Sequence, residues 1–223
     1  MGTTVSEIRG LIIVICFSLI MHRTGTSAVN YLTLGFTELP LNSSNLHNHK
    51  PYNLPINARY SFKHGVHKFW LYSTDEPLSL NSTTRPRSEI RIRGYDYSHG
   101  IWQFEGHGFV PYDTSGVCIM QVFGAHPKRA TTLMLRMIDG WLAYYGGPFL
   151  VPNMWERWFR LNVIHDVEAS IVKVYVDGVQ VYQAPGHGGS FHYFKFGLYA
   201  QPNASYYMES RWKGIRVLKK DYY

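Results

Sequence analysis

The chain has few cysteines, little sign of helix, and no long apolar segment beyond its N-terminus. Of the two cysteines, Cys16 lies in the apolar N-terminal stretch and Cys118 is left in the remainder. One cysteine cannot form an internal disulfide, so we expect the fold to depend on its hydrophobic core. Cys118 stands in an apolar run, which predicts a buried small side chain rather than a reactive thiol. No segment after residue 28 is long and apolar enough to span a bilayer.

Motifs for metals and nucleic acids are also missing. The chain holds 11 histidines, but none stands at metal-site spacing next to carboxylates, so we expect no required metal and no cofactor. The net charge is +7, yet the basic residues are not clustered in a helix and match no nucleic-acid motif. Nucleic acid is therefore a weak candidate. The charge instead favours anionic partners such as acidic polysaccharides, organic acids or a membrane surface.

The N-terminus is typical of a secretory signal peptide. Arg9 precedes a short apolar stretch over residues 11–21, and small residues end at Ala28, where we expect cleavage. An uncleaved N-terminal anchor is the competing interpretation, but the apolar stretch is short for a membrane span. The mature chain, residues 29–223, then has 195 residues and a net charge of +6, because Arg9, Arg23 and Glu7 leave with the signal.

We expect the mature chain to form one domain, since 195 residues suffice for one sizeable core. We expect a monomer. Because a signal peptide directs a protein into the secretory pathway, we expect this protein outside the cell, including in a cell wall, or in the vacuole. The sequons at Asn42, Asn81 and Asn203 would accept glycans on a eukaryotic secretory route.

Short alternating segments rich in Val, Ile, Tyr, Phe and Trp predict an all-β fold. Asp139-Gly140 and Asp177-Gly178 predict tight hairpins, because a type I′ turn needs positive φ at both central residues. Residues 29 to about 58 are rich in Asn, Pro, Leu and Ser and predict an irregular lead-in. Many short antiparallel strands indicate two packed sheets, a sandwich or jelly roll. The expected strands span residues 66–72, 89–93, 101–110, 117–123, 131–138, 141–145, 157–165, 171–176, 179–182, 193–201 and 211–218.

One expected strand carries a ladder of cations. In the run over residues 87–93, alternation puts Arg87, Glu89, Arg91 and Arg93 on one face. Arginine suits bidentate recognition of carboxylates, so the ladder indicates a site for an anionic ligand such as a carboxylated sugar or an organic acid. The alternative is a solvated edge strand with an internal ion pair, and this run alone gives the two about equal weight.

Two further strands carry polar groups of interest. Gln121 is a polar residue in an apolar strand, which fits either a ligand contact or a hydrogen-bonded structural amide. In the strand over residues 193–201, one face is aromatic and apolar and should pack into the core. The other face is either plain solvent surface or a ligand groove, and it carries Tyr193, Lys195, Gly197, Tyr199 and Gln201.

Together these three strands resemble the three signature motifs of the alginate lyase 2 superfamily of polysaccharide lyases. Those motifs are an Arg-Thr/Ser-Glu-Leu/Val-Arg strand, a Gln-Ile/Val-His strand and a Tyr-Phe-Lys-Ala-Gly-x-Tyr-x-Gln strand. Within that superfamily the segments 89–97, 102–106, 158–166 and 206–213 are similar to the plant citrate-binding proteins and the fungal glucuronan lyases. The resemblance runs from about residue 35 to the C-terminus. It implies a concanavalin-like β-jelly roll with a concave groove for a uronic acid polymer.

The resemblance also implies roles for individual residues. β-Elimination removes the C5 proton of a uronate and expels the O4 of the glycosidic bond. The C5 proton becomes acidic enough only when the neighbouring carboxylate is neutralised. By resemblance, Arg87 and Gln121 neutralise the carboxylate, Tyr193 acts as base, acid or both, and Lys195 supports it. A tyrosine with an ordinary pKa near 10 needs nearby cations to act as a base. The remaining residues expected to bind ligand are Glu89, Arg91, Tyr199 and Gln201.

One position departs from the superfamily pattern. Phe123 stands where many alginate lyases have the histidine, and a phenyl ring cannot transfer a proton. Either the site binds acids without turnover, or Tyr193 makes both proton transfers. The second scheme works for 1,4-linked glucuronate and mannuronate and fails for guluronate, so we expect little or no action on polyguluronate. His192 should point to the opposite face, and His107 carries little weight as a substitute. His47 and His49 lie in the lead-in, where we expect them to be solvated.

Three functions therefore remain open from the sequence. The protein is a polyuronate lyase acting on glucuronan-like chains, a binding protein for citrate or a similar polycarboxylate, or a noncatalytic glycan-binding module. Phe123 weakens the interpretation as a lyase relative to an ordinary alginate lyase. The retained Tyr193, Gln121 and Arg87 weaken the interpretation as a noncatalytic module. Citrate is small for a long groove, so we expect it to mimic a uronate carboxylate in the same site.

Overall fold

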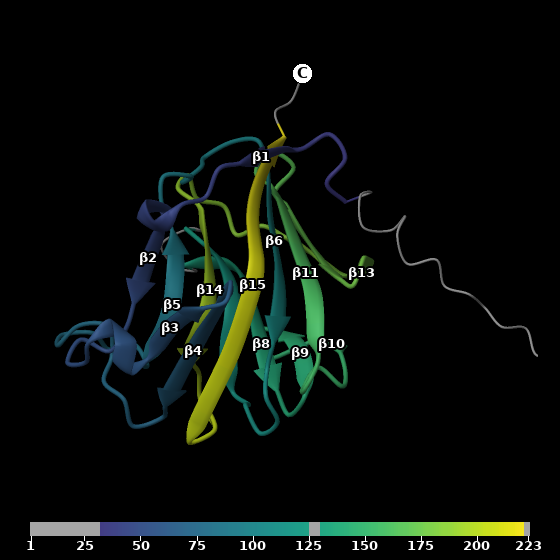
Figure 1. Cartoon of the computed structure of the whole chain (residues 1–223). Helices are drawn as coiled ribbons and strands as arrows, with labels where there is room; N and C mark the ends of the chain where they lie inside the picture. The colour runs from purple at the N-terminus through teal and green to yellow at the C-terminus, as the bar shows by residue number, and fades with distance from the viewer. Residues whose placement is uncertain (1–31, 125–129, 221–223) are drawn as a thin grey trace, which may run out of the picture.

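The structure is a computed structural model that describes residues 32–124 and 130–220 as two antiparallel β-sheets packed face to face (Figure 1). The predicted signal peptide lies outside the described residues. In spatial order, the first sheet contains β13 (Val179–Pro185), β12 (Ile171–Val176), β11 (Trp158–Asp166), β6 (Ile101–Phe109), β15 (Tyr207–Lys220), β4 (Val66–Tyr72) and β3 (Tyr60–Lys63), with β1 (Thr37–Leu39) also paired to β15. The second contains β10 (Phe149–Val151), β9 (Trp141–Tyr144), β8 (Thr131–Ile138), β7 (Val117–Phe123), β14 (Tyr193–Ala200), β5 (Arg87–Ile92) and β2 (Leu46–His49). This arrangement confirms the predicted all-β sandwich.

The core lies between the sheets and is rich in aromatic rings. Phe196 of β14 contacts Phe69, Phe104 and Trp212 of the facing sheet, with ring centroids 5.7, 5.9 and 6.0 Å away. These four side chains are fully buried. Such aromatic contacts add to the free energy gained from burying large apolar surfaces. The apolar face of the strand over residues 193–201 is therefore part of the core, as its alternation predicts, and its polar face must point outward.

Both Asp-Gly pairs form the hairpins that the sequence predicts. Asp139 and Gly140 join β8 to β9 with φ values of 48° and 80°, and Asp177 and Gly178 join β12 to β13 with φ values of 52° and 87°. Positive φ at both central residues matches the right-handed twist of the flanking strands. Cys118 is buried, as predicted.

The expectation of an irregular lead-in is wrong over part of its length. Besides the short 3₁₀ helices η1 (Ser43–Asn45) and η2 (Ile56–Ala58), this region forms β1 and β2. The strand β2 pairs with β5, so β5 lies between β2 and β14 and is not an edge strand. The interpretation of β5 as a solvated edge is therefore wrong. The composition of β2, Leu-His-Asn-His, hides it, because it lacks the β-branched and aromatic residues that mark strands.

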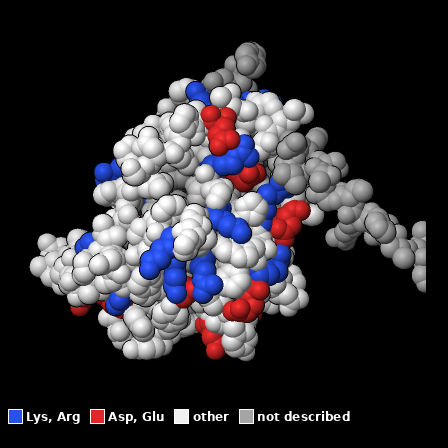
Figure 2. All heavy atoms as spheres, viewed as in Figure 1, with Lys and Arg blue, Asp and Glu red and all other residues white. Residues whose placement is uncertain are grey.

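The outer face of the first sheet carries charges of both signs. Figure 2 views this face and shows Lys and Arg side chains interspersed with Asp and Glu. Arg211 and Lys68 pair with Glu209, and Arg216 pairs with Glu38 and Glu105. Neighbouring carboxylates therefore neutralise much of the charge of these three cations. In the part of the chain that the structure describes, no helix is long and apolar enough to cross a membrane.

Candidate functional site

The three strands that carry the predicted site are neighbours in the second sheet, in the order β7, β14, β5. Lys195 of β14 stands opposite Gln121 on one side and Arg91 on the other. Directly opposite residues of an antiparallel pair share one face. The register therefore places eight side chains on one outer face, which we call the groove face: Arg87, Glu89, Arg91, Gln121, Phe123, Tyr193, Lys195 and Tyr199.

The groove face is recessed, although neither sheet of the described residues covers it. The exposed fraction is 7% for Arg87, 2% for Gln121 and 2% for Lys195. Charged and amide side chains on an open sheet surface would ordinarily be exposed. Near one end of the face, Arg91, Phe123, Phe191 and Tyr193 line a cavity of about 450 Å³. The recess and the cavity make this face the best candidate for a ligand site.

The carboxylate of Glu89 is the centre of the groove face. It accepts hydrogen bonds from Lys195 Nζ at 2.8 Å, Arg87 Nη1 at 3.1 Å and Gln121 Nε2 at 2.7 Å. Burial alone raises the pKa of Glu89, but the charges of Lys195 and Arg87 and the nearby His49 outweigh burial and hold the pKa well below its usual value. Glu89 is therefore ionised at all physiological pH values. It fixes the positions of the arginine, the lysine and the glutamine amide.

Aromatic rings cover the two arginines of β5. The guanidinium of Arg91 lies 3.9 Å from the ring centre of Tyr193 and donates to Asp96 Oδ2 at 2.9 Å. The guanidinium of Arg87 lies 3.9 Å from the ring centre of Tyr199. In both side chains the Nε–H is buried and has no acceptor among residues 32–124 and 130–220. Stacking on a ring fixes the plane of a guanidinium while leaving hydrogen-bond donors at its edge.

The positive charge of the groove face is smaller than the sequence suggests. Arg87, Arg91 and Lys195 contribute three positive charges, while Glu89 and Asp96 contribute two negative charges through the ion pairs just described. This set therefore keeps a net charge of +1. The predicted ladder is confirmed for Arg87, Glu89 and Arg91, whereas Arg93 lies past the end of β5 and is exposed. Carboxylates neutralise most of the charge, and the remaining charge suits one bound carboxylate.

Tyr193 and Phe123 stand opposite each other across β14 and β7, with ring centroids 5.0 Å apart. The Phe123 ring also lies 5.1 Å from Lys195 Nζ. Burial raises the pKa of Tyr193; Arg91 acts in the opposite direction but does not outweigh it. The cations that the sequence places near this phenol therefore do not make it a ready base, and Phe123 supplies no second proton-transfer group.

Other predicted residues lie away from this cluster. The Gln201 amide donates to the backbone carbonyl of Ala200 at 3.0 Å, just past the end of β14, and is not part of the cluster. His192 is buried against His165 with ring centroids 4.7 Å apart, on the core side as expected. His107 belongs to β6 of the other sheet and does not reach the groove face.

His49 is the residue that sequence reasoning placed wrongly. We expected a solvated side chain, but it stands opposite Glu89 on β2, and its Nδ1 lies 3.5 Å from Glu89 Oε1. Its side chain is 13% exposed. The alternation of residues 46–49 puts His47 and His49 on one face, but no local signal indicates that this segment pairs with β5.

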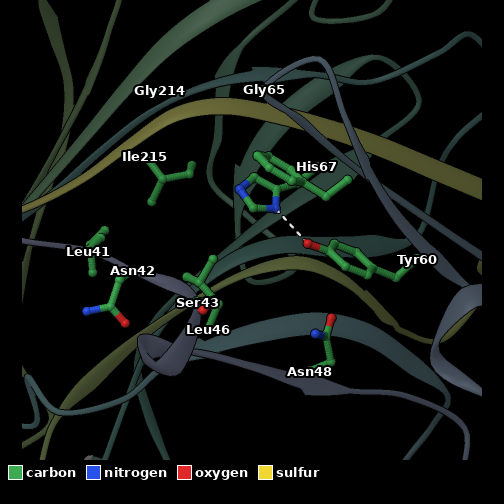
Figure 3. A pocket seen from close by; sticks show the side chains of 11 residues that line it. Leu41, Asn42, Ser43, Leu46, Asn48, Tyr60, Gly65, His67, Gly214 and Ile215 are labelled. Atoms are coloured by element: carbon green, nitrogen blue, oxygen red, sulfur yellow. Dashed lines mark hydrogen bonds between the residues drawn. The ribbon is translucent and has the colours of Figure 1, made fainter.

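A second cavity, of about 470 Å³, lies between the edges of the two sheets (Figure 3). Leu41, Leu46, Phe62 and Ile215 contribute apolar walls, and Tyr60 and His67 join by a hydrogen bond of 2.9 Å. None of the residues that line it is charged at neutral pH, since burial lowers the pKa of His67 to about 4. This cavity does not suit a carboxylate. Among residues 32–124 and 130–220, no group of three or more His, Cys, Asp or Glu side chains could hold a metal ion.

Comparison with known proteins assigns the fold. The family model described as alginate lyase matches residues 36–219. The chain belongs to the alginate lyase family. A curated relative, the citrate-binding protein of Hevea brasiliensis, is 48% identical over 190 residues, which cover 85% of this chain and 79% of that protein.

Solved alginate lyases share the fold of this family member at low sequence identity. The alginate lyase AlgAT5 of polysaccharide lyase family 7 superposes with a TM-score of 0.61 at 16% identity, over 78% of this chain and 93% of its own. The alginate lyase of a Corynebacterium species gives a TM-score of 0.59 at 16% identity, over 81% and 91% of the two chains. These likenesses confirm the jelly roll that the motifs imply. At such identities they carry no information on substrate.

Proposed function

We propose that this member of the alginate lyase family binds carboxylates on the groove face, either along an acidic glycan of the glucuronan type or in a small polycarboxylate such as citrate. The observation that carries the proposal is the set of cations that Glu89 and Asp96 hold on a recessed face, with one net positive charge left over. A preorganised cation in a recess binds an anion more strongly than a flexible one on an open surface, because less conformational entropy is lost.

The name of the Hevea relative agrees with this proposal, since a protein 48% identical to this chain is called citrate-binding. A citrate carboxylate and a uronate carboxylate present the same two oxygens to a guanidinium. We therefore place citrate and the uronate carboxylate at one position, beside Arg91, whose edge reaches the cavity next to Tyr193.

Titration calorimetry on the purified protein at low salt tests the proposal with citrate and with a glucuronan oligomer. We expect both ligands to bind, and R91Q to weaken both by about tenfold or more, as expected for a charge-assisted hydrogen bond. The matched control is R157Q, because Arg157 forms an ion pair with Asp177 at the edge of the other sheet, outside its strands. The proposal fails if the native protein binds neither ligand, or if R157Q weakens binding as much as R91Q.

A second candidate function is β-elimination on 1,4-linked glucuronan. It is favoured by one observation: Tyr193 shares the groove face with Arg87 and Gln121 and lines the cavity where a sugar would lie. Tyr193 then makes both proton transfers, since Phe123 makes none.

Ultraviolet absorbance of the unsaturated uronide product separates binding from turnover. The substrates are glucuronan, polymannuronate and polyguluronate, each with the native protein and with Y193F. A signal on glucuronan that is lost in Y193F establishes a lyase that works through Tyr193. Binding without any signal assigns a carboxylate-binding protein, and cleavage of polyguluronate by the native protein rules out the tyrosine-only scheme.

A further inference from the structure

Arg136 of β8 lies on the groove face, outside the cluster around Glu89. It stands opposite Cys118 of β7, Cys118 stands opposite Tyr199 of β14, and Tyr199 stands opposite Arg87 of β5. Opposite residues of neighbouring antiparallel strands share one face, so these four residues form a row across the sheet. The row has an arginine at each end.

Arg136 differs from the other groove-face arginines in having no counter-charge. Arg87 pairs with Glu89 and Arg91 pairs with Asp96, whereas no described carboxylate forms an ion pair with Arg136. The side chain is partly buried, and its Nε–H is buried without an acceptor in the part of the chain that the structure describes. Withdrawing a cation from water without a partner costs free energy, and an anion from outside removes much of that cost.

The distance between the two arginines limits what can bridge them. Adjacent strands lie about 4.8 Å apart, so the backbones of Arg136 and Arg87 are separated by three strand spacings, about 14 Å. Arg87 is tied to Glu89 and stacked on Tyr199 of β14, so β7 still separates its guanidinium from Arg136 on β8. The short carbon chain of citrate cannot present carboxylates to both arginines at once. A polymer that carries a carboxylate on every sugar can.

We propose that Arg136 is a second carboxylate-binding point on the groove face, and that the ligand this row serves is a chain of uronates lying across the strands rather than an acid of the size of citrate. The inference rests on the proposed carboxylate-binding function and adds to it a choice between the two ligand classes. Citrate then occupies the Arg91 position alone.

Titration calorimetry with glucuronan oligomers of increasing length, and with citrate, tests this inference on the native protein and on R136Q. We expect native affinity to rise with oligomer length until the chain reaches Arg136. R136Q should weaken the longer oligomers by about tenfold and leave the shortest oligomer and citrate within about twofold. R136K should restore part of the loss, because it keeps a positive charge.

The control is K63Q, which removes an equal charge from an exposed position on β3 of the other sheet. A thermal unfolding curve for each variant confirms that it folds. The inference is overturned if R136Q leaves long oligomers unaffected, if it weakens citrate equally, or if K63Q has the same effect. It is also overturned if the native protein binds citrate but no oligomer, in which case carboxylate binding stands. Only a native protein that binds neither removes the proposed function as well.

Discussion

The variant E89Q should lower stability strongly while tightening the binding of anions. The Glu89 carboxylate is 3% exposed and holds Lys195 at 2.8 Å and Arg87 at 3.1 Å. Removing one partner of a buried ion pair leaves an uncompensated charge and costs about 3–5 kcal/mol. For a domain of this size each kcal/mol lowers Tm by about 2–4 °C, so we expect a loss of about 6–20 °C.

The same substitution adds one positive charge to the groove face. Citrate should therefore raise the Tm of E89Q by more than it raises the Tm of the native protein, since the added positive charge near Arg91 strengthens the binding of an anion to the folded state. The control is E38Q, because Glu38 pairs with Arg216 at an exposed position and such a pair contributes less than about 1 kcal/mol.

Glu89 also sets a pH dependence with a definite sign. Its pKa in the folded state lies below the ordinary value of 4.5, so it stabilises the fold fully above pH 4.5 and progressively less as the pH falls below that value. E89Q lacks this acid-dependent loss. Thermal unfolding followed by circular dichroism, with and without citrate, measures all of these effects. A Tm of E89Q within about 2 °C of native would refute the account of Glu89 as the centre of the site.

Three further predictions concern neighbouring positions. F123H should raise the rate of elimination on polyguluronate by about 10²–10⁴-fold over native in the absorbance assay, because it places a proton-transfer group opposite Tyr193. No gain in rate would show that Phe123 is not what limits turnover. G197A should destabilise the protein by about 1–3 kcal/mol in urea unfolding, because the added methyl group would lie 2.6 Å from the Cα of Glu89 at a φ of 133°; a neutral effect would contradict the close packing of β14 on β5. As the pH falls from 6.5 to about 4, the native protein loses stability because the folded state keeps His67 neutral while the unfolded state binds a proton, and H67Q should reduce this loss. An unchanged pH profile of Tm would contradict this.

Much of the fold could be predicted from the sequence because its strands are regular. Alternation and the Asp-Gly turns identify β8, β9, β12 and β13, and the aromatic face of β14 identifies the core side. The strand β2 could not be predicted, because its two histidines and asparagine carry no strand preference and its pairing with β5 is a long-range contact. The position of His49 beside Glu89 depends on that pairing and was missed with it.

The site was only partly predictable for a similar reason. Alternation places Arg87, Glu89 and Arg91 on one face, but it does not reveal that Glu89 collects hydrogen bonds from two other strands. The degree to which carboxylates neutralise the ladder, and the burial that raises the pKa of Tyr193, follow from packing between distant segments. Arg136 carries no motif, and only the register across four strands connects it to the groove face.

The measurement that tests the central claim most directly is the nuclear magnetic resonance signal of each arginine side-chain Nε–H during a titration with citrate. We predict that the signal of Arg91 on the groove face shifts in a saturable way, while those of Arg157 and Arg211, which lie with the first sheet, do not. Shifts confined to Arg157 and Arg211, or saturable citrate binding with no change at Arg91, would contradict the claim that the groove face is the carboxylate site.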